Sequence, residues 1–65
     1  MEYYIEAIKD AAAKCEPGKL KPMLDFLMDC ATEDYKGGAL DVVELGDILT
    51  EYNDTLMVAN AVNYN

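Results

Sequence analysis

The sequence predicts an all-α protein, a small bundle of three helices, with a fourth short helix as an alternative. Two observations support this prediction. Apolar residues recur at helical spacing in three segments, and glycine or proline separates these segments. With 65 residues the chain has material for only one hydrophobic core, so we expect residues 1–65 to form one helical domain.

The first helix is expected over residues 2–15. This segment is rich in alanine, which favours helix, and its apolar positions follow helical spacing: Tyr4, Ile5, Ile8, Ala11, Ala12 and Cys15. Glu16-Pro17-Gly18 is expected to end it, because proline cannot donate a hydrogen bond within a helix and glycine supplies the backbone freedom of a turn.

The second helix is expected over residues 20–32, with Pro22 in its first turn, and residues 33–38 are expected to form a loop. The apolar positions of the second helix cover about 200° of the helical wheel. They are Leu20, Met23, Leu24, Phe26, Leu27, Met28, Cys30 and Ala31. A face this wide is more than one neighbouring helix can cover. We therefore expect this helix to lie at the centre of the bundle or to face a second subunit, as in a homodimer.

The third helix is expected over residues 40–61, with a frayed tail over residues 62–65. Its apolar residues alternate at spacings of three and four, the pattern of a helix that packs against a partner helix: Val42, Leu45, Leu49, Tyr52, Leu56 and Ala59. The alternative is a break at Asn53-Asp54, where either residue could cap a fourth helix.

The net charge of −8 comes from 13 acidic residues against five lysines. This balance disfavours direct binding of nucleic acid, because affinity for a polyanion comes mainly from basic side chains. It also disfavours anionic membrane surfaces. The basic surface of another protein is the natural partner.

The two cysteines and the absence of an obvious signal segment predict a cytoplasmic protein. A disulfide needs Cα atoms within about 7 Å. Cys15 is expected beside the first turn and Cys30 well along the second helix, so we expect both thiols to be reduced and buried. The first residues lack a basic stretch followed by an apolar one, and no apolar run is long enough to span a bilayer.

The sequence predicts neither an enzyme nor a metal or cofactor site. It has no histidine to act as a base near neutral pH, and neither cysteine has an evident activating neighbour. The window from Glu33 to Glu44 places acids and a glycine at some positions of a calcium loop, but Tyr35 and Gly37 stand where oxygen-bearing side chains are required.

The third segment carries an unusual run of acids. Asp41, Glu44, Asp47, Glu51 and Asp54 are spaced three, three, four and three residues apart, and no lysine follows Lys36. At 100° per residue they occupy an arc of about 140°, opposite the apolar residues of the same helix. Like charges at these spacings cost roughly 0.2 to 0.5 kcal/mol per pair, so the run indicates a function beyond solubility. Glu2, Glu6 and Asp10 form a secondary row.

Part of this segment resembles the start of the acidic second helix of acyl carrier proteins. The resemblance rests on Ala39-Leu40-Asp41-Val42-Val43-Glu44-Leu45, Ile48-Leu49 and Glu51. Ala39 stands where that family has the serine that carries phosphopantetheine, so carrier function is excluded. The similarity covers about a dozen residues, and the remainder of the chain does not follow the family. We interpret it as convergence on an acidic helix suited to docking on basic proteins.

The acids of the third helix predict a small binding protein that docks on a basic, nucleic-acid-binding surface of a partner and acts as an inhibitor or regulator. A nucleic-acid mimic of phage or mobile-element origin, such as an anti-CRISPR protein, would work in this way. The alternative is a helical oligomerisation or adaptor module whose acids only solubilise it. Its contacts would centre on Phe26, Leu27, Leu49, Tyr52 and Leu56.

Overall fold

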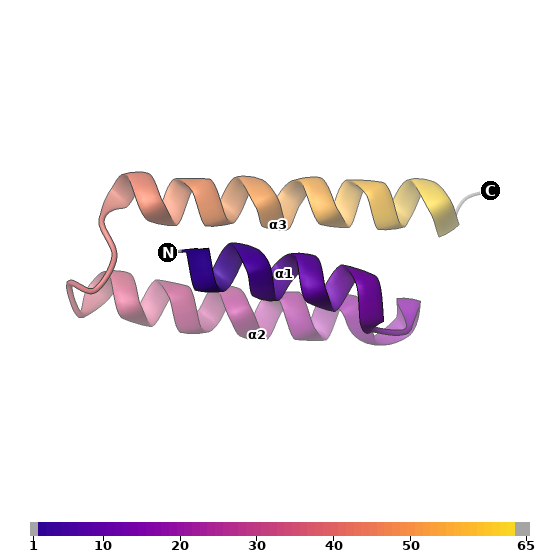
Figure 1. The fold of residues 1–65 in the computed structure, drawn as a ribbon, viewed down its shortest axis with the longest axis horizontal. Helices are drawn as coiled ribbons and strands as arrows, with labels where there is room; N and C mark the ends of the chain where they lie inside the picture. The colour runs from indigo at the N-terminus through magenta and orange to yellow at the C-terminus, as the bar shows by residue number, and fades with distance from the viewer. Residues whose placement is uncertain (1, 64–65) are drawn as a thin grey trace.

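The chain folds into three helices packed along a common direction (Figure 1). The computed structural model describes residues 2–63, apart from the side chains of residues 2, 17 and 61–63. The helices are α1 (Glu2–Lys14), α2 (Pro17–Lys36) and α3 (Val42–Asn63). Consecutive helices run antiparallel, so α3 lies parallel to α1, and each helix contacts both others. The all-α bundle expected from the sequence is confirmed.

The turn between α1 and α2 is shorter than expected, because Pro17 begins the second helix directly after the break. The residue before a proline is disfavoured in helical conformation, and Glu16 is extended, with φ −64° and ψ 148°. Proline fits the first position of a helix, where its missing N–H would have no partner. Pro22 therefore lies one turn further into α2 than expected.

Residues 33–36, expected to belong to a loop, form the last turn of α2. The helix stops only at the two glycines. Gly38 has φ +87°, which L side chains rarely adopt, and the Ala39 N–H donates to the Asp34 carbonyl at 2.8 Å. The Gly38 N–H also donates to the Tyr35 carbonyl at 3.1 Å, which completes a Schellman motif.

The third helix begins at Val42, later than expected, and runs unbroken to Asn63. No break occurs at Asn53-Asp54, so the described chain has no fourth helix there. Of the tail expected to fray, residues 62 and 63 belong to this helix, and residues 64–65 lie outside the described range. In Figure 1 the C-terminal turns of α3 extend past the start of α2.

The core forms where the three helices meet. Ile8, Leu24 and Ile48, one from each helix, are completely buried. Burying one such side chain stabilises the fold by about 1.5 to 3 kcal/mol. The other buried residues are Tyr4, Ala11, Leu20, Leu27, Ala31 and Leu40.

The apolar face of α3 differs from the expected one. Val42 and Leu49 are 67% and 45% exposed, whereas Ile48 is fully buried. The segment contains two overlapping apolar stripes, and the bundle packs the one through Ile48 against the core. Its other members are half-buried: Leu45, Tyr52, Leu56 and Ala59. Residues 48 and 49 differ by about 100° around the helix. Because Ile48 and not Leu49 is buried, a different side of α3 faces the core than the one expected, and the other side chains of α3 lie at different angles from the core.

Candidate functional site

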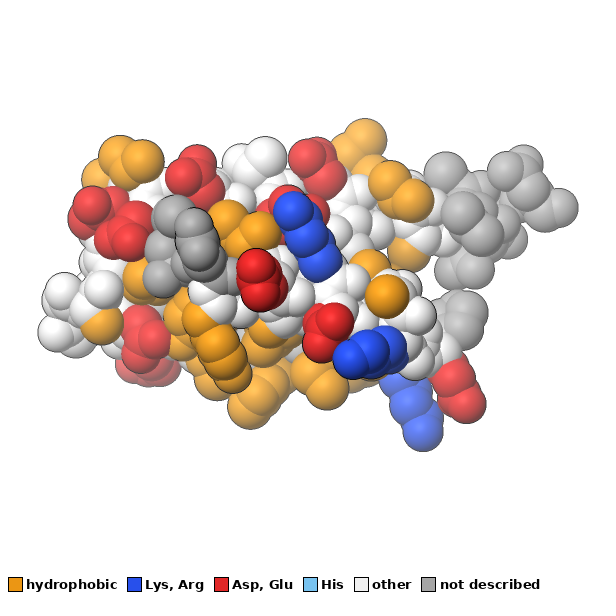
Figure 2. Space-filling view, in the orientation of Figure 1, with side chains coloured by type: hydrophobic (Ala, Val, Ile, Leu, Met, Phe, Trp, Pro, Cys, Tyr) orange, Lys and Arg blue, Asp and Glu red, His pale blue; other side chains and the backbone are white. Residues whose placement is uncertain are grey.

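The net negative charge of the protein is concentrated on α3 and its N-cap residue, Asp41. Five acids and no lysine follow residue 36, so this part of the chain carries five of the eight net negative charges. Figure 2 shows acidic side chains along the upper part of the molecule, over α3, with one basic side chain close to them. The five acids nevertheless divide into two groups with different surroundings.

Asp41 and Glu44 form a capping box at the start of α3. The Glu44 N–H donates to Asp41 Oδ1 at 2.8 Å, and the Asp41 N–H donates to Glu44 Oε1 at 3.1 Å. Leu40 precedes the cap and is buried, and Leu45 packs against the same core, as in a hydrophobic staple. Capping of the α3 N-terminus therefore explains why acids occur at these two positions. The acid at 41 with glutamate three residues later was a recognisable sequence signal for it.

Capping does not explain the other three acids of the run. We call these three the acidic edge: Asp47, Glu51 and Asp54. Asp47 and Asp54 are exposed, and Glu51 is half-buried. Among the described residues, none of the three takes part in an ion pair. At 100° per residue, the acids of α3 span about 80° and lie about 120° from the centre of its buried face. They flank the core instead of lying directly opposite it, which corrects the expected geometry.

The row expected on α1 is weaker than the acidic edge. Glu6 is exposed, but Asp10 pairs with Lys14 at 3.3 Å. The Glu2 side chain lies outside the described residues. A shallow depression on this helix is lined by Tyr3, Glu6, Ala7 and Asp10. The structure therefore adds one unpaired acid, Glu6, to the acidic surface.

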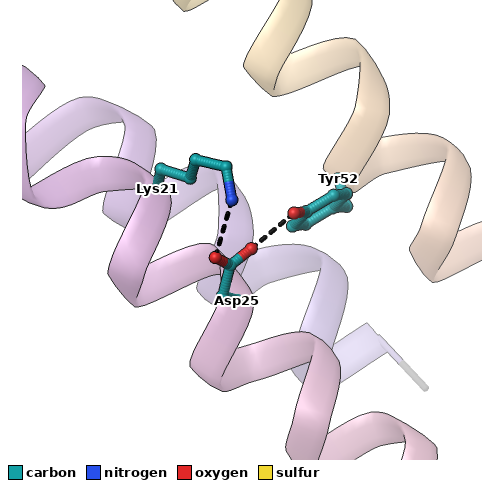
Figure 3. Close-up of polar contacts among 3 residues, drawn as sticks. All are labelled: Lys21, Asp25 and Tyr52. Carbon is teal, nitrogen blue, oxygen red and sulfur yellow. Dashed lines mark hydrogen bonds and ion pairs between the residues drawn. The ribbon is translucent and has the colours of Figure 1, made fainter.

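Asp25 joins two helices. Its carboxylate accepts hydrogen bonds from Lys21 Nζ at 2.8 Å and from the Tyr52 hydroxyl at 2.5 Å (Figure 3). The bond from Lys21, followed by that from Tyr52, lowers the pKa of the Asp25 carboxyl. The bond to Asp25 in turn raises the pKa of Tyr52 and that of Lys21.

A second tyrosine joins α1 to the end of α2. The Tyr4 hydroxyl donates a hydrogen bond to Asp34, and this bond, with burial as the next cause, raises the pKa of Tyr4 to about 12. Neither tyrosine–aspartate contact was predicted from the sequence. No local signal identifies them, because their partners are 30 and 27 residues apart.

The described residues bring together no group of three or more acids and cysteines placed to hold a metal ion. Cys15 and Cys30 are unpaired, as expected, but half-buried instead of fully buried. None of the helices combines the length and apolar character needed to cross a membrane, as far as the described residues go.

Several large apolar side chains are exposed on α2 and α3. Phe26 and Met23 on α2 are 62% and 42% exposed, and Met57 and Val58 on α3 are 68% and 64% exposed. Of the residues expected to centre an assembly surface, only Phe26 and Leu49 are exposed. Leu27, Tyr52 and Leu56 pack within the bundle.

We compared the chain with protein-family models, curated proteins and solved structures, and found no match in any of the three comparisons.

Proposed function

We propose that this chain is a small acidic binding protein, without catalytic activity, that docks through the acidic edge on the basic surface of a partner protein. The observation that carries the proposal is the placement of Asp47, Glu51 and Asp54 on one flank of α3 without an ion pair among the described residues. A cytoplasmic location and homodimer formation belong to this proposal.

The physical basis is electrostatic. Acids three or four residues apart on a helix lie about 5 to 6 Å from each other, and their mutual repulsion is relieved when a cationic surface covers them. A rigid helix holds them in a line, as a nucleic-acid strand holds its phosphates. The partner would therefore be a nucleic-acid-binding protein, and the chain would inhibit or regulate it by occupying its basic groove, as an anti-CRISPR protein of the mimic type does.

The test compares two double variants with the same net charge. D47K/D54K reverses both exposed acids of the acidic edge, and E16K/D29K reverses two exposed acids elsewhere. Each replacement adds two charge units, so both variants carry −4 instead of −8. Glu44 is avoided, because its reversal would disrupt the capping box.

The immobilised variants are used to capture proteins from the native host, and the captured protein is identified by mass spectrometry. We expect a nucleic-acid-binding protein that E16K/D29K retains, that D47K/D54K loses, and that added nucleic acid displaces. Binding should weaken steeply as salt rises. Equal capture by both variants, or binding that is insensitive to salt, would refute the docking role of the acidic edge.

A second candidate function is a helical adaptor whose apolar surface makes the contacts. The exposure of Phe26, at 62%, next to the exposed Met23 on the same face of α2 favours it, because neighbouring exposed apolar side chains mark interaction surfaces. This function predicts capture that F26D abolishes and D47K/D54K leaves unchanged.

A further inference from the structure

The outer face of α2 carries a stripe of five residues at spacings of four, three, four and three, all exposed except Cys30, which is half-buried against the core. We call it the α2 stripe: Lys19, Met23, Phe26, Cys30 and Glu33. At 100° per residue it spans about 80° on the side of α2 away from Leu24 and Ala31. Figure 2 shows apolar side chains gathered along the lower part of the molecule, where α1 and α2 lie. Intramolecular packing therefore leaves part of the wide apolar face of α2 uncovered.

The charges of the α2 stripe are arranged symmetrically about its aromatic centre. Lys19 and Glu33 each lie seven residues from Phe26, about 10 Å along the helix, and on nearly the same line. Both side chains are exposed, and within the described part of the chain neither forms an ion pair. A surface with opposite charges at equal distances on either side of an apolar centre is complementary to itself.

We propose that the α2 stripe is the interface of a homodimer with two-fold symmetry. Two copies of α2 cross antiparallel with the axis at Phe26. In this arrangement Lys19 of each copy lies opposite Glu33 of the other, and the two Phe26 rings meet at the centre. Isologous interfaces require this self-complementarity, because the same patch must face itself.

The distribution of charge favours α2 over α3 as the helix on which a second copy of this chain binds. Residues 17–36 contain three of the five lysines and four acids, so α2 is nearly neutral. By contrast, α3 has acids but no lysine, and two copies of it would repel each other. The α2 stripe is thus a surface on which two chains of net charge −8 can approach at low electrostatic cost.

The size of the α2 stripe sets the strength of the dimer. The 20 residues of α2 span about 30 Å, and one face of one helix covers less than the roughly 800 Å² per partner of a standard interface. The dimer is therefore weak and depends on protein concentration. The acidic edge lies on another helix, so this inference is independent of the docking proposal.

The first experiment is sedimentation equilibrium of the purified chain in reducing buffer, from about 10 μM to about 1 mM, a range suited to a weak interface. We expect a reversible monomer–dimer equilibrium. F26D should raise the dissociation constant at least about tenfold, since it buries two facing carboxylates. M57D alters a similarly exposed side chain on α3 and should leave the equilibrium unchanged. Circular dichroism confirms that each variant folds.

The second experiment tests the register. K19E and E33K alone should each weaken self-association, because each places like charges opposite one another in the dimer. Mixed in equal amounts, they should form a heterodimer, since each then supplies the charge that the other needs. Both variants are net negative, at −10 and −6, so overall charge does not attract them. The double variant K19E/E33K should dimerise like the natural chain.

Two results would overturn the proposal. One is a monomer at all concentrations, and the other is a dimer that F26D and M57D weaken equally. A dimer that F26D dissociates, but in which mixing K19E with E33K restores nothing, would refute the antiparallel register. None of these measurements involves the docking partner, so failure here removes the homodimer from the proposed function and leaves docking through the acidic edge standing.

Discussion

The Tyr52 hydroxyl donates a hydrogen bond of 2.5 Å to the Asp25 carboxylate, and this contact joins α3 to α2. Tyr52→Phe removes the donor and keeps the ring, so it should lower the midpoint of urea unfolding by weakening the attachment of α3. Tyr35→Phe removes a hydroxyl from an exposed ring on α2 and should leave the midpoint unchanged. Equal midpoints for the two variants would show that the bond contributes nothing to stability.

The same contact predicts a dependence of stability on acid. Lys21 and Tyr52 lower the pKa of Asp25 below its ordinary value of 3.8. A carboxyl with a lowered pKa stabilises the fold above its unfolded-state pKa, and the contribution is lost as pH falls through the folded-state pKa. The difference in unfolding free energy between the natural chain and Asp25→Asn should thus be constant near neutral pH and shrink below pH 3.8. A difference that does not change with pH would contradict this.

Helix periodicity predicted the three helices but not where they end. The second helix was expected to stop at Thr32, although residues 33–36 contain no breaker, so it continues to the glycines. The third helix was expected to start at the apolar Leu40. The structure instead uses Asp41 as the cap and buries Leu40 in front of it. At both places capping contacts, and not the apolar pattern, set the end of the helix.

The acidic edge was predicted in part. Sequence spacing placed the acids of α3 together on one side, but it could not decide which of two overlapping apolar stripes the core would take. Ile48 and Leu49 are neighbours in sequence and equally apolar, and only packing against α1 and α2 distinguishes them. The roles of Asp25 and Asp34 depend on tyrosines on other helices, which no local pattern shows.

Tyr4 should ionise at an unusually high pH. Its hydrogen bond to Asp34 raises its pKa from 10.0 to about 12. A raised pKa means that the contribution to stability is complete below pH 10 and is lost as pH rises towards 12. Ultraviolet titration of tyrosinate should show a step near pH 12 that Tyr4→Phe removes. Tyr3→Phe, which changes the exposed neighbouring ring, should retain it, and a step that survives Tyr4→Phe would refute the assignment.

Two glycines should respond to alanine with opposite signs. Gly38 has φ +87°, so Gly38→Ala strains the end of α2 and should cost about 1 kcal/mol. Gly46 lies inside α3, and no neighbouring part of the fold comes within 4 Å of the position that an alanine methyl group would take. Gly46→Ala should therefore stabilise the protein by about 0.5 to 1 kcal/mol. Chemical denaturation measures both. Destabilisation by Gly46→Ala would contradict this prediction.

Asp41 allows helix capping to be separated from charge. Its Oδ1 accepts the Glu44 N–H, and an asparagine side chain can accept the same bond without a charge. Asp41→Ala should therefore lower stability by about 1 kcal/mol, and Asp41→Asn should lower it by much less. Urea unfolding of the three proteins measures the difference, and equal losses for the two variants would show that the charge at the helix N-terminus matters more than the cap.

Asp41→Asn also tests how far the docking surface extends along α3. If the partner contacts only Asp47, Glu51 and Asp54, Asp41→Asn should bind as tightly as the natural chain. If the surface includes the start of the helix, Asp41→Asn should weaken binding at low salt and leave it unchanged at high salt, because screening removes the contribution of an exposed charge. Since Asp41→Asn keeps the cap, any loss of affinity comes from the missing charge and not from a frayed helix.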